Sequence, residues 1–370
     1  MKPTHCLRSA LFLALAVSAA SCSKQNLTAP ADAPAVLSSK TRSGLGTVES
    51  ALASPAWLSL DALKFAEDPA GAAAGVRPLL RDAAAQAGVL AGTASTSGLV
   101  GEVSQELAGR VAGSLAVVIP PDVRGTTYVF DPEQHRYVAD PAREGAPQNG
   151  VRYILYAVNP LTGEPRVSEE IGHADLTDQG DETPNAASLR LRAVSDGITF
   201  VDYTVALTGA PHALELAVNG TFFDRSKHLG FAIRARAETT EERQSLALQF
   251  QLEVPEDGFA LANQARAVAN QADGTVHAEQ AVHIDATTFA ISSVHGPDRV
   301  DATVGVNGVP FAEIHGRAGT LVVVGPDGEA LAAEERVALG QLLGLFDGVS
   351  RMLGHLLEPV GALFALVPRA

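Results

Sequence analysis

Alternation of apolar and polar residues dominates the middle of the chain, from about residue 115 to residue 325. The clearest apolar rows are Thr199, Val201, Tyr203, Val205 and Leu207, then Leu229, Phe231, Ile233 and Ala235, then Leu246, Leu248, Phe250, Leu252 and Val254. A period of two is typical of strands that bury one face and expose the other to water. The pattern therefore predicts an antiparallel β domain over residues 115–325.

Short turn sequences separate the predicted strands and indicate how they connect. They are Asn159-Pro-Leu-Thr-Gly163, Asp196-Gly197, Asp257-Gly258, Asp273-Gly274 and Asn307-Gly308. Asp-Gly and Asn-Gly pairs favour tight hairpins between antiparallel strands. No helical segment lies between these turns, which argues against a fold with parallel strands and helical crossovers. We predict an up-and-down meander whose last strand is Thr320–Val324.

The hydrophobic period becomes helical on both sides of the β region. Residues 44–114 are rich in Ala and carry apolar residues three or four positions apart, which predicts weakly hydrophobic helices. Over residues 326–370 a longer stripe consists of Leu339, Leu342, Leu343, Phe346, Val349, Leu353, Leu356, Leu357, Val360, Leu363 and Phe364. Charged residues such as Asp347 and Arg351 in this segment argue against a transmembrane helix. We expect the C-terminal helix to cover the apolar face of the sheet, with the N-terminal helices beside it.

These elements predict a mainly β fold with flanking helices. We expect a long, curved antiparallel meander, open or half-barrel in form, packed on an amphipathic C-terminal helix and preceded by an Ala-rich helical segment. This architecture resembles the periplasmic lipoprotein carriers and outer-membrane lipoprotein receptors, whose unclosed barrels enclose an apolar lumen. No motif of those families occurs here, so the resemblance is one of architecture alone. If the lumen is not filled by the helix, an apolar groove is expected at Phe231, Ile233, Leu248, Phe250 and Leu252.

The N-terminus has the three parts of a secretory signal peptide. Lys2 and Arg8 precede an apolar run over residues 10–17, and small residues follow over 18–21. Because the small residues end at Cys22, the segment resembles the signal of bacterial lipoproteins. The resemblance implies cleavage before Cys22 and attachment of a diacylglycerol and an acyl chain, such as palmitate, to that residue. Ser23 after the cysteine implies export to the outer membrane.

The lipoprotein resemblance has one departure and one alternative. The family prefers Leu three residues before the cysteine, where this chain has Ala19. The alternative is an ordinary signal peptide cleaved near Ala20, which would leave Cys22 as a free thiol. The lipoprotein interpretation divides the chain into a signal peptide (1–21), a lipidated flexible tether (22–43), a helical segment (44–114), the β domain (115–325) and the C-terminal helix (326–370). The tether is rich in Ser, Thr, Ala and Pro, as flexible linkers are.

Charge and cysteine content exclude several classes of function. The chain has 42 Asp and Glu against 27 Lys and Arg, a net charge of −15, so nucleic-acid binding is not expected. Its only two cysteines are Cys6 and Cys22, which excludes a disulfide scaffold and a multi-cysteine metal site. We find no motif of a serine hydrolase, zinc protease or P-loop enzyme. We therefore expect no cofactor and no enzymatic activity.

Three polar or small-residue patterns could carry chemistry, and each has a simpler interpretation. His277, Glu279, His283 and Asp285 share one face of a predicted strand and could bind zinc, or could be its solvated face. Asp175, Asp178, Asp181 and Glu182 could form a calcium loop or a solvated acidic loop. Gly340, Gly344 and Gly348 could form a close-contact face of the C-terminal helix, or a weak solvent-facing side.

The sequence thus favours a non-enzymatic lipoprotein anchored in the outer membrane, with its body facing the periplasm or the cell surface. Its expected partners are the membrane, through the lipid on Cys22, and an apolar ligand such as a lipid, or another envelope protein. One alternative is a purely structural or interaction protein whose sheet is filled by its own helices. A second alternative is a hydrolase without a recognisable motif.

Overall fold

The structure is a computed structural model. It describes residues 38–60, 63, 119–159, 162, 164–180, 186–210, 212–223, 226–240, 242–270, 272–296, 299–317 and 320–365. The predicted signal peptide, Cys22 and most of the helical segment 44–114 lie outside these residues. What the sequence predicts for these segments therefore remains a prediction.

The described helices and strands have the following bounds. The helices are α2 (Ser39–Leu52), α3 (Pro55–Leu58) and α6 (Ala333–Ala365), and η4 (Pro121–Val123) and η5 (Pro255–Asp257) are short 3₁₀ turns. The strands are β1 (Thr127–Asp131), β2 (Arg136–Ala139), β3 (Gly150–Val158), β4 (Pro165–Asp178), β5 (Ala186–Ser195), β6 (Ile198–Ala210), β7 (Ala213–Phe223), β8 (His228–Thr239), β9 (Arg243–Val254), β10 (Phe259–Asn270), β11 (Val276–Ile284), β12 (Thr287–His295), β13 (Val300–Val306), β14 (Val309–Arg317) and β15 (Thr320–Val324).

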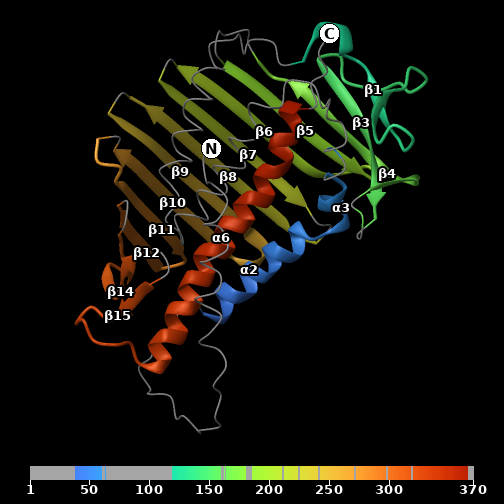
Figure 1. Ribbon diagram of the computed structural model, residues 1–370. Helices are drawn as coiled ribbons and strands as arrows, with labels where there is room; N and C mark the ends of the chain where they lie inside the picture. The colour runs from blue at the N-terminus through green and yellow to red at the C-terminus, as the bar shows by residue number, and fades with distance from the viewer. Residues whose placement is uncertain are drawn as a thin grey trace.

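All fifteen strands form one open sheet, in the order β15 to β3 and then β1 and β2. From β3 to β15 each strand pairs antiparallel with the next, so the predicted long antiparallel meander is confirmed, including the bounds of its last strand (Figure 1). The exception is at one end, where β1 pairs in parallel with β3 and antiparallel with β2. Because of this exception, the β1–β2 hairpin lies beside β3, the strand that follows it in the chain.

The hairpin turns follow the residues that the sequence singled out. Asp196 and Gly197 have φ values of 51° and 74°, and Asn307 and Gly308 have values of 52° and 79°. Two successive residues with positive φ form the turn that matches the twist of an antiparallel hairpin, and Asp, Asn and Gly adopt this conformation most readily. Asp285 also has a positive φ, of 51°, and starts an unpredicted turn between β11 and β12.

The predicted flexible tether over residues 22–43 is too long. Helix α2 begins at Ser39, and Ser38 caps it by accepting a hydrogen bond from the Thr41 amide at 3.0 Å. A Ser cap satisfies one of the free amides of the first turn. Thr41, Gly44 and Val48 are buried on one side of the helix, so packing also holds its first turn in place.

Helix α6 crosses one face of the sheet, and α2 lies along it (Figure 1). Leu342, Phe346, Val349 and Leu353 are fully buried, which confirms that the C-terminal helix packs on the sheet. Within the part of the chain that is described, no helix combines the length and hydropathy that spanning a bilayer requires.

The buried surface of α6 is wider than the predicted stripe. Leu345 and Met352 are also buried, although they lie beside the stripe rather than in it. Both line a space between α6 and α2, together with Leu45 of α2. Because α2 covers a second side of α6, residues outside the sheet-facing stripe are removed from water as well.

Candidate functional site

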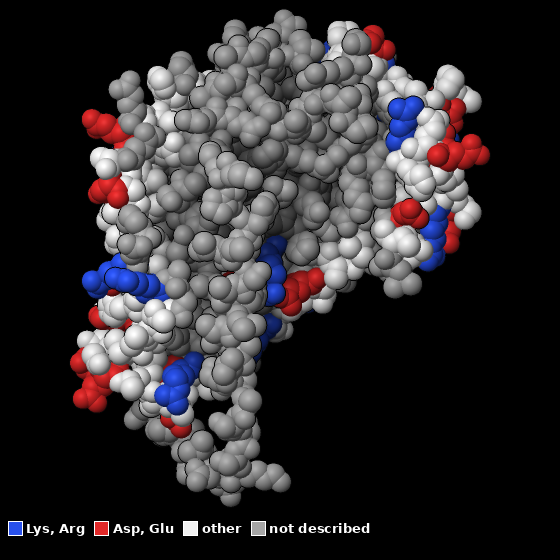
Figure 2. Space-filling view, in the orientation of Figure 1, with Lys and Arg blue, Asp and Glu red and all other residues white. Residues whose placement is uncertain are grey.

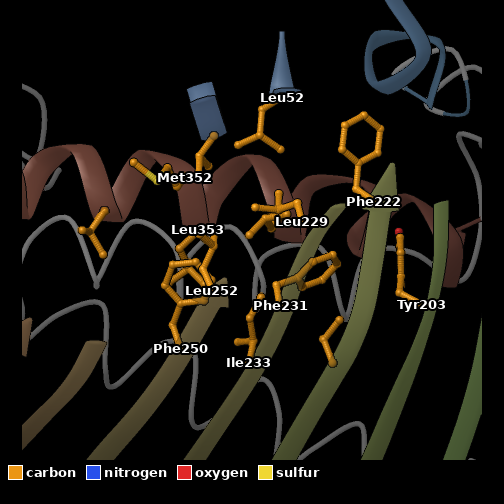
Figure 3. Close-up of a cluster of buried hydrophobic side chains, with 14 of the residues drawn as sticks. Leu52, Tyr203, Phe222, Leu229, Phe231, Ile233, Phe250, Leu252, Met352 and Leu353 are labelled. Atoms are coloured by element: carbon orange, nitrogen blue, oxygen red, sulfur yellow. The ribbon is translucent and has the colours of Figure 1, made fainter. Parts of the chain in front are cut away.

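The five residues of the predicted apolar groove lie in the hydrophobic core. Phe231, Ile233, Leu248, Phe250 and Leu252 are at most 5% exposed. Figure 3 shows Phe250 and Leu252 close to Leu353 of α6. At these positions the chain's own side chains occupy the space between sheet and helix. Neither of the two cavities described below is lined by any of the five.

The predicted zinc candidates do not converge. His277 and Glu279 are exposed on β11, as a solvated strand face requires. His283 Nδ1 lies 2.9 Å from the Thr288 hydroxyl. The alternation placed Asp285 on the strand, but the residue lies in the turn after β11. There it pairs with Lys40 of α2 at 3.0 Å. Among the described residues no three metal-binding side chains cluster.

The predicted acidic loop is also arranged differently. Asp175 and Asp178 belong to strand β4 rather than to a loop, and Asp181 and Glu182 lie outside the described residues. The Asp175 carboxylate accepts two hydrogen bonds from Arg152, and Asp178 lies 3.5 Å from Arg124. Both acids therefore have cationic partners.

The row of glycines on α6 makes no close contact with the described residues. A Cβ added at Gly340, Gly344 or Gly348 would meet none of their atoms within 4 Å. Gly344 and Gly348 border a space of about 240 Å³ between α6 and α2. Within the described part of the chain nothing supports the close-contact interpretation.

A polar cleft of about 370 Å³ lies where the β1–β2 hairpin meets strands β3 and β4. It is lined by Thr127, Arg143, Glu144, Arg152, Ile154, Glu170, Gly172 and His173. Figure 2 shows acidic and basic side chains next to each other at the end of the molecule that carries β1 to β4. The volume is at the lower end of the range for small-molecule sites.

Backbone pairing brings these residues together from separate segments. The parallel register places Thr127 of β1 beside Arg152 of β3. The buried Tyr137 hydroxyl of β2 donates a hydrogen bond to the Ile154 carbonyl at 2.8 Å, which fixes the hairpin on β3. The pairing of β3 with β4 shifts by one residue between Gly172 and Glu170. Such a bulge re-aims the side chains around it.

Two guanidinium groups are held in the cleft by carboxylates. Arg152 donates from Nε and Nη2 to Asp175 at 2.7 Å and 2.8 Å. Arg143 donates from Nη1 to both carboxylate oxygens of Glu170 at 2.9 Å. A guanidinium has five N–H donors. The Nη1 group of Arg152 and the Nη2 group of Arg143 have no partner among the described residues, so each side chain keeps donors for a further acceptor.

Two further groups complete the polar lining. Thr127 is 1% exposed, and its buried hydroxyl has no hydrogen-bond partner among the described residues. A buried hydroxyl left unpaired destabilises the fold by about 1–3 kcal/mol, so such groups are usually satisfied by a protein group or an ordered water. Burial and the Arg152 guanidinium lower the pKa of His173 below its ordinary value. The ring is therefore neutral at neutral pH.

The cleft offers free donors on its two guanidinium groups. The Glu170 carboxylate is already paired with Arg143, whereas the Glu144 carboxylate has no ion pair among the described residues. An acceptor-rich group such as a carboxylate fits this arrangement. The cleft leaves one signal in the sequence, which is Arg152, the only charged residue in the otherwise apolar strand Gly150–Val158.

Comparisons with models of known protein families, with curated proteins and with solved structures find no match to this chain.

Proposed function

We propose that this protein is a non-enzymatic binding protein, anchored in the bacterial outer membrane through lipidated Cys22, whose polar cleft takes a small carboxylate-bearing ligand. The observation that carries the binding proposal is the pair of guanidinium groups of Arg143 and Arg152, each held by a carboxylate with N–H groups to spare, in one cleft that Thr127 also lines. The anchor is supported by the signal-like pattern that ends at Cys22.

Charge balance limits the kind of ligand. The four ionised residues that line the cleft are two Arg and two Glu, so their formal charges sum to zero. A polyanion would meet the unpaired Glu144 carboxylate, whereas a ligand with a single carboxylate uses the free guanidinium donors, and its hydroxyl groups can donate to Glu144. A sugar acid meets these conditions, since it joins one carboxylate to several hydroxyls.

The ligand proposal is tested by isothermal titration of the full chain with glucuronate, and with glucose as the uncharged matched control. We expect binding of glucuronate and none of glucose. Thr127→Val removes the free hydroxyl at nearly constant volume and should weaken binding several-fold. Arg152→Gln should weaken it at least about tenfold, since hydrogen bonds to charged groups contribute about 1.5–3 kcal/mol.

Arg190→Gln is the control for these variants. Arg190 pairs with Asp202 in the same way as Arg152 pairs with Asp175, but it does not line the cleft. Equal heats for glucuronate and glucose, or equal losses in Arg152→Gln and Arg190→Gln, would refute the carboxylate site.

The anchor is tested separately by labelling cells with radioactive palmitate. The wild-type chain and Cys6→Ser should incorporate label, and Cys22→Ser should not. We also expect Cys22→Ser to move from the membrane fraction to the soluble periplasmic fraction. Equal labelling of all three chains would refute the lipidation of Cys22 without bearing on the cleft.

A purely structural envelope protein is the second candidate. The burial of Phe231, Ile233 and Phe250 beneath α6 favours it over a carrier of apolar ligands, because a lipid would have to displace packed side chains. This candidate predicts no saturable ligand in the cleft, so the same titration separates the two.

A further inference from the structure

Strand β15 is an apolar edge of the sheet that faces solvent. Leu321, Val322 and Val323 are 43%, 59% and 38% exposed, and the strand contains no charged residue. It is the last strand in the sheet order, and among the described strands it pairs with β14 alone. An exposed edge with apolar side chains is a template for pairing with another chain, and proteins usually protect such edges with charges, Pro or bulges.

The opposite edge of the same sheet is protected in this way. Strand β2 has only four residues and begins at Arg136, which donates two hydrogen bonds to Gln134. His135, just before it, adopts a positive φ of 50° in the turn between β1 and β2. Strand β15 carries no comparable charge along its length.

The register of β15 shows which backbone groups point outward. Thr320 pairs with Arg317 across a two-residue connection, and Val322 pairs with His315. In such a hairpin the closing pair exchanges both hydrogen bonds, and alternate residues point the other way. Thr320, Val322 and Val324 therefore bond to β14. Leu321 and Val323 direct their amide and carbonyl groups away from the sheet.

We propose that β15 pairs antiparallel with β15 of a second copy of this chain, about a two-fold axis at Val322. This register places Leu321 opposite Val323 of the second copy, so the four outward amides and four outward carbonyls of these residues form two reciprocal pairs. The two Val322 side chains face each other on one side of the joined sheet. Cross-strand pairs of apolar residues stabilise such a junction.

Charge at the two ends of β15 favours the antiparallel orientation. Arg317, at the N-terminal end, is exposed and has no ion pair among the described residues. Asp327 and Glu329 follow the C-terminal end. Antiparallel pairing brings the basic end of one copy to the acidic end of the other, whereas parallel pairing would bring like charges together. A two-fold contact uses the β15 edge of each copy once and leaves none free for a third copy. It therefore gives a dimer rather than a fibre.

The mass of the full chain in solution tests this proposal. The Cys22→Ser variant is used so that no attached lipid or detergent adds to the measured mass. We expect light scattering after gel filtration to give twice the mass of one chain. Val322→Lys places two like charges opposite each other and should raise the dissociation constant of the dimer at least about tenfold. Val337→Lys is the matched control, because Val337 is 62% exposed but lies on α6.

Oxidative cross-linking tests the register. Val322→Cys, in a chain that also carries Cys6→Ser and Cys22→Ser, should form a disulfide-linked dimer, since opposed side chains at the axis lie close together. Val337→Cys should stay monomeric on a denaturing gel. A monomeric wild-type mass, masses that grow beyond the dimer, or equal cross-linking of both variants would overturn the two-fold pairing. None of these outcomes depends on the ligand of the cleft.

Discussion

The hydroxyl of Thr47 in α2 donates a hydrogen bond to the carboxylate of Asp257, 2.9 Å away, in the turn between β9 and β10. Lys227 approaches the same carboxylate with Nζ at 2.7 Å and 2.8 Å from its two oxygens. Asp257 thus joins the first described helix to two hairpins of the sheet. The Asp257-Gly258 pair can be recognised as a turn from the sequence, but the contact of Asp257 with α2 cannot.

Asp257→Asn should weaken the docking of α2 at neutral pH. The Lys227 ammonium and the Thr47 hydroxyl lower the pKa of the Asp257 carboxyl below its ordinary value of 3.8. Its stabilisation is therefore complete above pH 3.8 and is lost as the pH falls through the lowered pKa. We expect the variant to melt about 1–3 °C below wild type at pH 7, with the difference closing in acid. A difference that grows on acidification would contradict this assignment.

Phe346→Ala should destabilise the fold strongly. Phe346 is fully buried between α6 and the sheet, and truncation of a buried Phe costs about 3–5 kcal/mol. Urea unfolding measures the loss. Val337→Ala on the same helix is the control and should change stability by less than about 0.5 kcal/mol, since Val337 is exposed. Similar midpoints for both variants would show that α6 is peripheral.

Gly344→Ala should stabilise the protein, although Gly44→Ala should destabilise it. An added Cβ at Gly344 meets no atom of the described residues within 4 Å, and Ala is favoured over Gly inside a helix by about 1 kcal/mol. At Gly44 in α2 the added Cβ would collide with the Phe259 ring. Thermal melts of the two variants should therefore shift in opposite directions. A lower melting temperature for Gly344→Ala would mean that this side of α6 contacts another molecule.

A fluorescent fatty acid should not bind to the purified body. The predicted groove residues are packed against α6, so a lipid finds no ready volume there. Phe250→Trp should cost about 1–3 kcal/mol through overpacking of a filled site. Native mass spectrometry checks the first expectation and urea unfolding the second. A reproducible lipid adduct that is lost in Phe250→Trp would instead establish a carrier.

The polar cleft shows why the candidate site escaped sequence reasoning. Thr127, Arg143, Arg152 and Glu170 come from β1, the segment after β2, β3 and β4. No spacing along the chain connects them, because the parallel pairing of β1 with β3 breaks the order of the meander. The histidines that share a strand show the opposite case, in which residues close in sequence do not meet. His277 and His283 share a strand but point to solvent and to Thr288, respectively.

The sequence by itself determined the meander, its turns and the bounds of its last strand. These features depend on local sterics: a period of two sets which side chains share a face, and Asp-Gly or Asn-Gly sets where the backbone can reverse. Only the tertiary structure decided that Leu345 and Met352 are buried, that Asp285 pairs with Lys40 of α2, and that β15 keeps an open edge. Those outcomes depend on which distant segments meet, and contacts between distant segments are fixed by packing of the whole chain rather than by any local pattern.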